Sequence, residues 1–259
     1  MIYLNKLSKQ RVTNKAVSWI RQTLYRLDRK VSNVTGVRGD FANNGITYLE
    51  REEYGPSNLE EKLERAKSGG PFEYPDIMNL NRAVLSMVGD ESRIVELGAG
   101  TGKFALAVAN ELRRSVVASE YDKKTYHWCL HNIGESELLK FVNGPVTSAY
   151  GQFDLAVSIE VVEHVKNFHE FLKGISELAP RALITTPNRM RSIRDYHSGP
   201  PRFIKHVREW TAGEFYWVLR CFWADVKMYG VISNSKPAVT EVSVDTRLSP
   251  LIADCRDPL

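Results

Sequence analysis

A glycine-rich turn at residues 96–102 is the clearest candidate for ligand binding in the sequence. Its three glycines, Gly98, Gly100 and Gly102, allow a sharp turn and a close approach of the backbone to a ligand. A helix that starts near Thr101 would present N–H groups to a carboxylate or a phosphate. The turn therefore predicts a bound ligand with an anionic group, and the spacing of the glycines narrows the choice.

That spacing argues against two kinds of nucleotide-binding loop. In a P-loop, Gly102 and Lys103 would form the Gly-Lys pair, but the first glycine would then fall on Leu97 and the magnesium ligand on Phe104. In a dinucleotide-binding fold the third glycine would fall on Lys103, one residue later than it occurs. The turn is therefore typical of neither loop.

Acidic and histidine side chains follow a later apolar run and could act on a substrate. Glu163 and His164 come just after the run 155–159, and His206 precedes a predicted helix. Because histidine gains or loses a proton near neutral pH, His164 is the favoured general base, with Glu163 and His206 as further catalytic candidates. A lining role for His164, without proton transfer, is an equal alternative.

Short apolar runs predict the strands that must position these residues. They lie at 94–97, 116–119, 141–142, 155–159 and 182–185, and their weak alternation is typical of a parallel sheet buried on both faces. Helical patterns lie between them, and Thr211 and Glu214 have the spacing of a capping box. We expect a doubly wound α/β fold with a mostly parallel, seven-stranded sheet. Residues 226–229 and 239–244 alternate and predict an antiparallel edge hairpin.

From residue 93 to residue 225 the sequence resembles the class I S-adenosylmethionine-dependent methyltransferases. The spacing Glu-x-Gly-x-Gly-x-Gly at 96–102 resembles their first signature, and residues 153–165, 186–189 and 206–211 resemble the ubiquinone-biosynthesis subgroup. The resemblance implies a Rossmann-like methyltransferase fold, S-adenosylmethionine as cofactor, and methyl transfer to a small-molecule acceptor, at an oxygen. The cofactor-binding residues that it implies are Glu96, Gly98, Ala99, Gly100, Gly102, Glu120, Tyr121 and Ser158.

Three features bear on how such a cofactor and acceptor are recognised. Glu120 ends the second predicted strand, where a carboxylate can accept hydrogen bonds from both ribose hydroxyls. Many relatives carry an acidic residue for adenine after the third strand, but this chain has Asn-Gly-Pro-Val at 143–146, so we expect backbone groups and apolar packing to serve instead. No Asp/Asn-Pro-Pro-aromatic motif follows the fourth strand, which disfavours methylation of the nitrogens that this motif serves.

Two alternative functions remain at this stage. Glu160, Glu163 and His164, followed by His206 in the segment 206–211, also resemble the metal site of RNA ribose 2′-O-methyltransferases, and positions i, i+3 and i+4 share one helical face. We expect no metal, because nothing in the sequence beyond this resemblance places His206 beside His164. A non-catalytic cofactor-binding module that recruits a partner is the second alternative.

Composition and charge suggest a single catalytic domain with an extension. Hydrophobic and charged fractions of 43% and 25% are typical of a globular protein. The three cysteines are scattered along the sequence, which is compatible with a reducing cytoplasm. No apolar run approaches the length of a membrane span. We expect an N-terminal extension at 1–75, which holds a basic amphipathic helix at 17–34 and a connector or cap, and a methyltransferase domain at 76–259.

Basic segments bear on the partners. The net charge of +4 is uneven, because residues 1–40 are strongly basic and the remainder is slightly acidic. Packing on the body or in a homodimer is the leading role for the N-terminal helix, with RNA or an anionic membrane surface as alternatives. The long connection 189–210 is also basic and would suit an anionic small-molecule substrate, although a solvated face is equally compatible.

Overall fold

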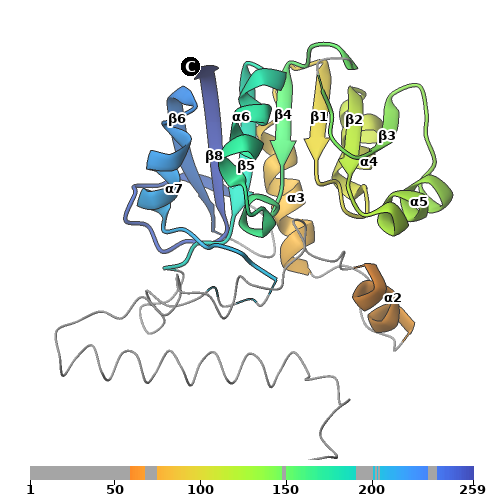
Figure 1. The fold of residues 1–259 in the computed structure, drawn as a ribbon, viewed down its shortest axis with the longest axis horizontal. Helices are drawn as coiled ribbons and strands as arrows, with labels where there is room; N and C mark the ends of the chain where they lie inside the picture. Colours follow the sequence, from red (N-terminus) through yellow and green to blue (C-terminus); the bar gives the residue numbers. More distant parts are fainter. Residues whose placement is uncertain are drawn as a thin grey trace, which may run out of the picture.

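Eight β-strands form one sheet in the described part of the chain (Figure 1). The computed structural model describes residues 59–67, 75–147, 150–190, 201, 203, 205–232 and 238–259. The strands are β1 (Arg93–Leu97), β2 (Ser115–Glu120), β3 (Leu139–Asn143), β4 (Leu155–Ser158), β5 (Arg181–Thr186), β6 (Trp223–Val231), β7 (Val239–Glu241) and β8 (Leu251–Pro258). Their order across the sheet is β3-β2-β1-β4-β5-β8-β6-β7.

The first five strands confirm the predicted doubly wound arrangement. The chain runs from β1 outward to β2 and β3 and then returns to β4 on the other side of β1, with all of these pairs parallel. Ligands of such sheets bind where the strand order reverses, outside the carboxyl ends of the strands. The glycine-rich turn follows β1 and the segment that begins at Glu160 follows β4, so the fold brings both candidate segments to that point.

The far edge differs from the expected seven strands by one. The predicted hairpin is present as β6 and β7, but β8 lies between β5 and β6 and is antiparallel to both. Five consecutive residues of β8, from Leu251 to Cys255, are buried, so this strand has no alternation that would reveal it. Its buried Asp254 is tied to β5 by Arg181, with Nε to Oδ1 at 2.8 Å.

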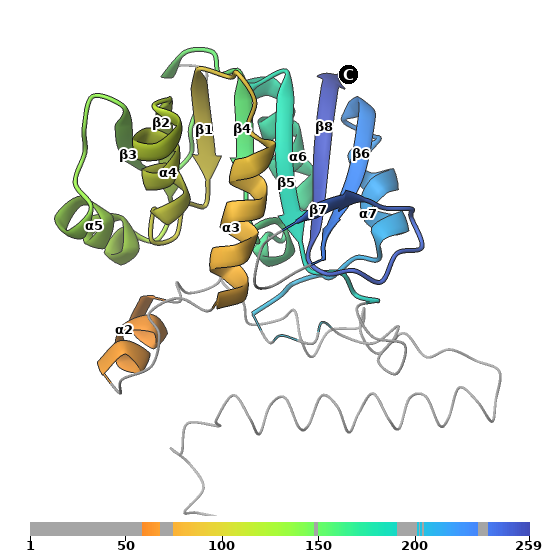
Figure 2. The same cartoon turned by 180° about the vertical axis from the view of Figure 1, so that it is seen from behind.

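Helices cover both faces of this sheet (Figure 2). Two clusters of apolar side chains fill the space between helices and sheet, one containing Leu80, Phe104 and Cys129, the other Leu172 and Phe215. The helices of the first face are α3 (Pro75–Met87), α4 (Lys103–Ala107) with its π-helical continuation (Val108–Leu112), and α5 (Lys123–Asn132). The helices of the second face are α6 (Phe168–Leu178) and α7 (Ala212–Leu219).

Two further short elements matter for the site. A 3-10 helix (Val162–His164) follows β4, and helix α2 (Leu59–Lys67) lies on the carboxyl-end side of the sheet in both views. The predicted capping box opens α7, where the Glu214 N–H donates to Thr211 Oγ1 at 3.1 Å and the Thr211 N–H donates to Glu214 Oε2 at 2.9 Å.

Several sequence-based expectations fall outside the described residues. These are the amphipathic helix at 17–34, nearly all of the extension at 1–75, and residues 191–200 of the long connection. The domain boundary at residue 75 stays a prediction. None of the helices in the described ranges is long and apolar enough to cross a bilayer.

Candidate cofactor and acceptor sites

The glycine-rich turn packs closely against a neighbouring side chain at Gly98 and is open at Gly100. Gly98 has φ +78°, and a Cβ atom added there would come within 2.4 Å of Val161 Cγ2. Gly100 has φ +54°, and a Cβ atom added there would meet nothing within 4 Å. The turn therefore packs against the segment after β4 and leaves room for a ligand beside Gly100.

Backbone N–H groups of this turn already donate within the protein. Those of Gly98 and Ala99 donate to the Ser119 carbonyl at 2.9 and 2.8 Å, and that of Gly102 donates to the Ala99 carbonyl at 2.8 Å. The Gly100 N–H donates to Glu120 Oε2 at 2.8 Å. These four N–H groups hold the turn in shape, and the expected contact of an anion with the helix that starts near Thr101 stays a prediction.

Glu120 stands at the end of β2 with both carboxylate oxygens facing the turn and the next loop. Oε2 accepts the Gly100 N–H and Oε1 accepts the Asp122 N–H, each at 2.8 Å. Burial raises the pKa of Glu120, and these two hydrogen bonds oppose that effect. Each carboxylate oxygen can accept further hydrogen bonds, so a ribose diol fits here. Tyr121 follows on the rim and is 44% exposed.

Glu96 lies beneath the turn and is buried. Its Oε2 accepts the Ala105 N–H at 3.1 Å, which ties β1 to α4. Burial raises the pKa of Glu96 to about 8, and the charge of Glu120 adds to this effect. The structure thus gives Glu96 a supporting position below the cofactor turn.

Ser158 is the last residue of β4 and is fully buried. Its Oγ has no hydrogen-bond partner among the described residues. An unpartnered buried hydroxyl at the carboxyl end of a central strand suits a polar ligand atom.

The loop after β3 holds its shape without an acidic side chain. The Asn143 Nδ2 donates to the carbonyls of Glu120 and Tyr121 at 2.8 and 3.1 Å, and Ser119 Oγ donates to the Gly144 carbonyl at 2.6 Å. Neither Ser119 nor Asn143 is among the residues that sequence reasoning selects, because their role appears only when β2 and β3 are paired.

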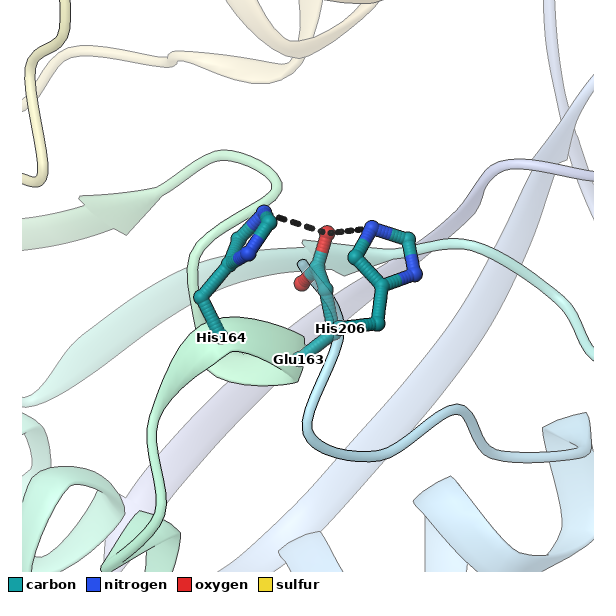
Figure 3. A group of neighbouring side chains, drawn as sticks. All are labelled: Glu163, His164 and His206. Atoms are coloured by element: carbon teal, nitrogen blue, oxygen red, sulfur yellow. Dashed lines mark ion pairs between the residues drawn. The ribbon is translucent and has the colours of Figure 1, made fainter. Parts of the chain in front are cut away.

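The predicted catalytic residues come together in a second cluster (Figure 3). His164 Nε2 and His206 Nε2 each lie 4.0 Å from the same Glu163 oxygen, Oε1. The two imidazole rings are 4.8 Å apart between centroids, at an interplanar angle of 78°. The structure thus places His206 beside His164, although the sequence alone does not predict that the two residues meet.

Backbone hydrogen bonds fasten the distant loop to this cluster. The Val207 N–H donates to the Glu163 carbonyl at 2.7 Å, and the Arg208 N–H donates to the same carbonyl at 3.2 Å. The Arg189 N–H donates to the Trp210 carbonyl at 2.8 Å. Both ends of the long connection are therefore tied down, and His206 is held beside the 3-10 helix.

The outer ring nitrogens fix the orientation of both histidines. His164 Nδ1 lies 3.0 Å from the Lys205 carbonyl, and because a carbonyl can only accept, Nδ1 carries the proton. His206 Nδ1 lies 2.8 Å from Glu209 Oε1. With Nδ1 as the donor in a neutral ring, the lone pair of each Nε2 faces Glu163.

Two carboxyl groups lie just after β4, of which Glu163 is buried and Glu160 is half-buried. Glu160 has φ +54°, its N–H donates to Thr185 Oγ1 at 2.9 Å, and its Oε1 accepts from the same hydroxyl at 3.0 Å. Burial raises the pKa of Glu160 to about 7 and raises that of Glu163 well above its usual value. Glu163 Oε1 has no hydrogen-bond partner among the described residues.

Three ligand atoms of the kind that bind metal ions therefore gather in one place. Within the described ranges, Glu163, His164 and His206 offer atoms that all lie within 4.8 Å of one another. Glu160, the fourth residue of the metal-site alternative, is not part of this group. The cluster adjoins the cofactor turn, because Val161 packs against Gly98.

Comparisons with known proteins identify the family of this chain. Residues 57–222, more than half of the chain, match the model of a family described as methyltransferase domain. No curated protein matches the chain.

Solved structures with the same fold include an S-adenosylmethionine-dependent methyltransferase from Thermotoga maritima, with TM-score 0.52 and 14% identity over 70% of this chain and 88% of that one. A TehB-like methyltransferase from Corynebacterium glutamicum has TM-score 0.50 and 17% identity, over 77% and 96%. The N-terminal domain of EvdMO1, solved with SAH bound, has TM-score 0.52 and 14% identity, over 90% and 96%. At these identities the likeness shows the fold.

Proposed function

Given that this chain belongs to the methyltransferase domain family, we propose that it transfers the methyl group of S-adenosylmethionine to an oxygen of a small-molecule acceptor. The single observation that carries the choice of an oxygen is the orientation of His164. Its Nδ1 donates to the Lys205 carbonyl, so its Nε2 is the basic atom. This Nε2 faces Glu163, in the segment that adjoins the cofactor turn. A hydroxyl nucleophile needs such a base, since it arrives protonated.

S-adenosylmethionine, when bound, supplies an electrophilic methyl group on a sulfonium. The residues that fit it are those of the turn, with Glu120 toward the ribose hydroxyls and the open space at Gly100. Ser158 offers a buried hydroxyl beside them. These groups bind and orient, which is the larger part of catalysis for an in-line displacement.

His164 would accept the acceptor's hydroxyl proton at Nε2 while the oxygen–methyl bond forms and the methyl–sulfur bond breaks, which would leave S-adenosylhomocysteine. The imidazolium that results lies 4.0 Å from Glu163 Oε1, and its Nδ1 stays bonded to the Lys205 carbonyl. Burial favours the protonated form of Glu163, whereas a neighbouring imidazolium favours its ionised form, and this attraction is stronger in a buried setting than in water. His206 Nε2 lies 4.0 Å from the same Glu163 oxygen, and Glu209 orients the His206 ring through Nδ1.

A second candidate, metal-dependent methylation of an RNA ribose 2′-oxygen, has its own supporting observation. Glu163 Oε1 is buried without a hydrogen-bond partner among the described residues and lies 4.0 Å from each of two Nε2 atoms. Each histidine has an oxygen atom beside its Nδ1, as metal-binding histidines usually do. We expect no metal from the sequence because nothing there places His206 beside His164. The structure places the two rings side by side, so that reason no longer holds.

The predictions about partners stay proposals. In the long connection, Lys205 pairs with Glu61, and the Arg208 guanidinium lies over the rings of Phe168 and Trp210, so these two cations already have structural roles. An anionic acceptor would therefore rely on other basic residues. A homodimer or RNA contact through the N-terminal helix, the cytoplasmic location and the ubiquinone-biosynthesis subgroup also stay predictions.

The test of the proposed function is methyl transfer from radiolabelled S-adenosylmethionine to a panel of phenols, catechols, alcohols, amines and short RNAs. We expect transfer to a hydroxyl of a small molecule. Transfer to amines alone would overturn the choice of oxygen, and transfer to RNA alone would establish the second candidate. A protein that binds cofactor but methylates nothing in the panel or in a metabolite extract would be the non-catalytic module.

A further inference from the structure

An aromatic side chain of the long connection borders the cluster of Glu163, His164 and His206 (Figure 3). The Phe203 ring lies edge-on to the His206 ring, with centroids 5.0 Å apart and an interplanar angle of 67°. The His206 ring in turn lies 4.8 Å from the His164 ring. A single intervening ring therefore separates Phe203 from the proposed base.

The backbone holds Phe203 in this place, although its side chain reaches solvent. The His206 N–H donates to the Phe203 carbonyl at 3.0 Å, and the Val207 N–H donates to the Glu163 carbonyl at 2.7 Å. Phe203 is 40% exposed, whereas His206 is buried. Single exposed apolar rings are common on protein surfaces, but this one is fixed beside a candidate catalytic side chain. Its exposed surface is available to a bound acceptor.

Charges near the cluster favour an acceptor without negative charge. Glu163 and Glu209 are buried, and both lie within ion-pair distance of the His206 ring. The cations that follow Phe203 in the described part of the loop have partners. Lys205 Nζ lies 3.4 Å from a carboxylate oxygen of α2, and the Arg208 guanidinium lies over two aromatic rings. The described surroundings of the cluster thus suit an uncharged acceptor.

A phenol is an uncharged acceptor whose chemistry matches a histidine base. A phenolic hydroxyl has an ordinary pKa of about 10, as in tyrosine, whereas an aliphatic alcohol holds its proton far more tightly. The ordinary pKa of an imidazole is about 6.5. Proton transfer to His164 is therefore less unfavourable from a phenol than from an alcohol.

The ring of a phenol also fits beside Phe203. Aromatic pairs prefer offset-stacked or edge-to-face arrangements, with centroids about 4.5 to 7 Å apart. The distance from the Phe203 ring to the His164 ring cannot exceed the two ring spacings taken together. A ring in contact with Phe203 therefore stays close to the cluster, and its hydroxyl can point toward His164.

We propose that Phe203 is a specificity residue that packs against the ring of a phenolic acceptor, and that the acceptor is an uncharged phenol or catechol. The proposal rests on the oxygen methylation proposed above. In that reaction the phenol proton passes to His164 Nε2 and the phenol oxygen bonds to the methyl carbon. The methyl–sulfur bond breaks with its electron pair on sulfur, so the products are an aryl methyl ether and S-adenosylhomocysteine.

The first experiment compares three acceptors on the full chain, with methyl transfer from radiolabelled S-adenosylmethionine as the readout. Catechol has the aromatic ring, cyclohexane-1,2-diol has the same two hydroxyls on a saturated ring, and 3,4-dihydroxybenzoate adds a carboxylate to catechol. We expect the highest kcat/KM with catechol. A higher kcat/KM with either of the other two acceptors would overturn the proposal.

The second experiment tests the ring of Phe203. We expect Phe203→Leu to raise the KM for catechol by about 2- to 12-fold, the usual scale for one aromatic pair, with little change in kcat. Phe203→Trp keeps a ring and should restore most of the wild-type KM. Calorimetric titration of catechol into the S-adenosylhomocysteine complex should show the same order of affinities.

Tyr150→Leu is the matched control. Tyr150 is 42% exposed, close to the exposure of Phe203, but it precedes β4 and so lies at the opposite end of the sheet from the cluster. This variant should keep the wild-type KM. Calorimetry with S-adenosylhomocysteine on each variant shows whether the fold and the cofactor site are intact.

The remaining outcomes separate the two proposals. An unchanged KM in Phe203→Leu, or an equal rise in Tyr150→Leu, would overturn the role of Phe203. Methylation of aliphatic alcohols or of short RNAs, with none of catechol, would overturn the phenolic acceptor. A wild-type chain that methylates amines but no hydroxyl would instead overturn the proposed function itself.

Discussion

The imidazole of His206 stands edge-on to that of His164, with ring centroids 4.8 Å apart, although the two residues are far apart in the sequence. Both Nε2 atoms face one buried oxygen of Glu163. This arrangement can hold a proton or a divalent cation. Base catalysis and metal dependence predict different effects of mutation and chelation.

Removal of His164 tests its role as a base. We expect His164→Ala to lower kcat by about 10²- to 10⁴-fold, the usual contribution of a positioned base, with little change in S-adenosylhomocysteine affinity. The matched control is His169→Ala, because His169 lies exposed on α6 and outside the cluster. Steady-state kinetics with calorimetry on both variants checks this, and a His164→Ala enzyme as fast as the control would contradict it.

Chelation tests the metal-dependent candidate. If Glu163, His164 and His206 hold a cation, dialysis against EDTA should abolish activity and manganese should restore it, since imidazole ligands shift preference from magnesium toward transition ions. Manganese titration followed by electron paramagnetic resonance should then show weaker binding in each of Glu163→Gln, His164→Ala and His206→Ala. Full activity in metal-free enzyme would reject this candidate and leave the base.

Glu120 gives a direct test of ribose recognition. We expect Glu120→Ala to weaken S-adenosylhomocysteine binding by about 1.5 to 3 kcal/mol, or about 10- to 150-fold, from the loss of hydrogen bonds to a charged group. Glu177→Ala is the control, because Glu177 is exposed on α6 and faces Lys173. Calorimetry that shows no difference between these variants would remove Glu120 from the cofactor site.

Gly98 should tolerate no side chain. A Cβ atom there would come within 2.4 Å of Val161 Cγ2 at a φ of +78°, so we expect Gly98→Ala to destabilise the protein by roughly 1 to 3 kcal/mol and to abolish cofactor binding. The control is Gly174→Ala within α6, where a Cβ atom meets nothing within 4 Å. There we expect a gain of about 0.5 to 1 kcal/mol.

Urea unfolding measures both glycine variants. A Gly98→Ala protein as stable as wild type would show that the turn can move away from Val161. The double variant Gly98→Ala with Val161→Ala should recover part of the lost stability, because it removes the clashing methyl groups but not the unfavourable φ.

Local sequence patterns were enough to predict the centre of the fold. The five apolar runs that predict strands match β1 to β5, and the glycine spacing predicts the turn after β1. These features depend on neighbours in the sequence. Strand β8 is missed because its buried residues do not alternate and because its Asp254 is buried only with the help of Arg181, which comes from another strand.

The site residues also differ in whether their contacts are local or long-range in the sequence. Glu163 and His164 are adjacent, so their proximity is given, but His206 reaches them only through hydrogen bonds of the Val207 and Arg208 N–H groups to the Glu163 carbonyl. The position of helix α2 likewise depends on the ion pairs of Glu60 with Lys124 and of Glu61 with Lys205, which are far along the chain. Periodicity and motif spacing do not encode such contacts.

Glu96 provides a prediction about stability rather than activity. Burial raises its pKa to about 8, against an ordinary value of 4.5, so the folded protein favours the protonated form. Between these two values the folded chain binds more protons than the unfolded chain. The free energy of unfolding of the cofactor-free protein should therefore fall as the pH rises from about 4.5 to 8, and level off above that.

Glu96→Gln should flatten this dependence, because glutamine keeps an oxygen for the Ala105 N–H and has no proton to lose. We expect the slope between pH 5.5 and 7.5 to decrease by up to about 1.4 kcal/mol per pH unit. Part of the slope should persist, since burial also raises the pKa of Glu120 and Glu163. Urea titrations at several pH values, with exposed Glu177→Gln as control, measure the effect. Parallel stability curves for wild type and Glu96→Gln would mean that Glu96 is already ionised in the folded protein at neutral pH.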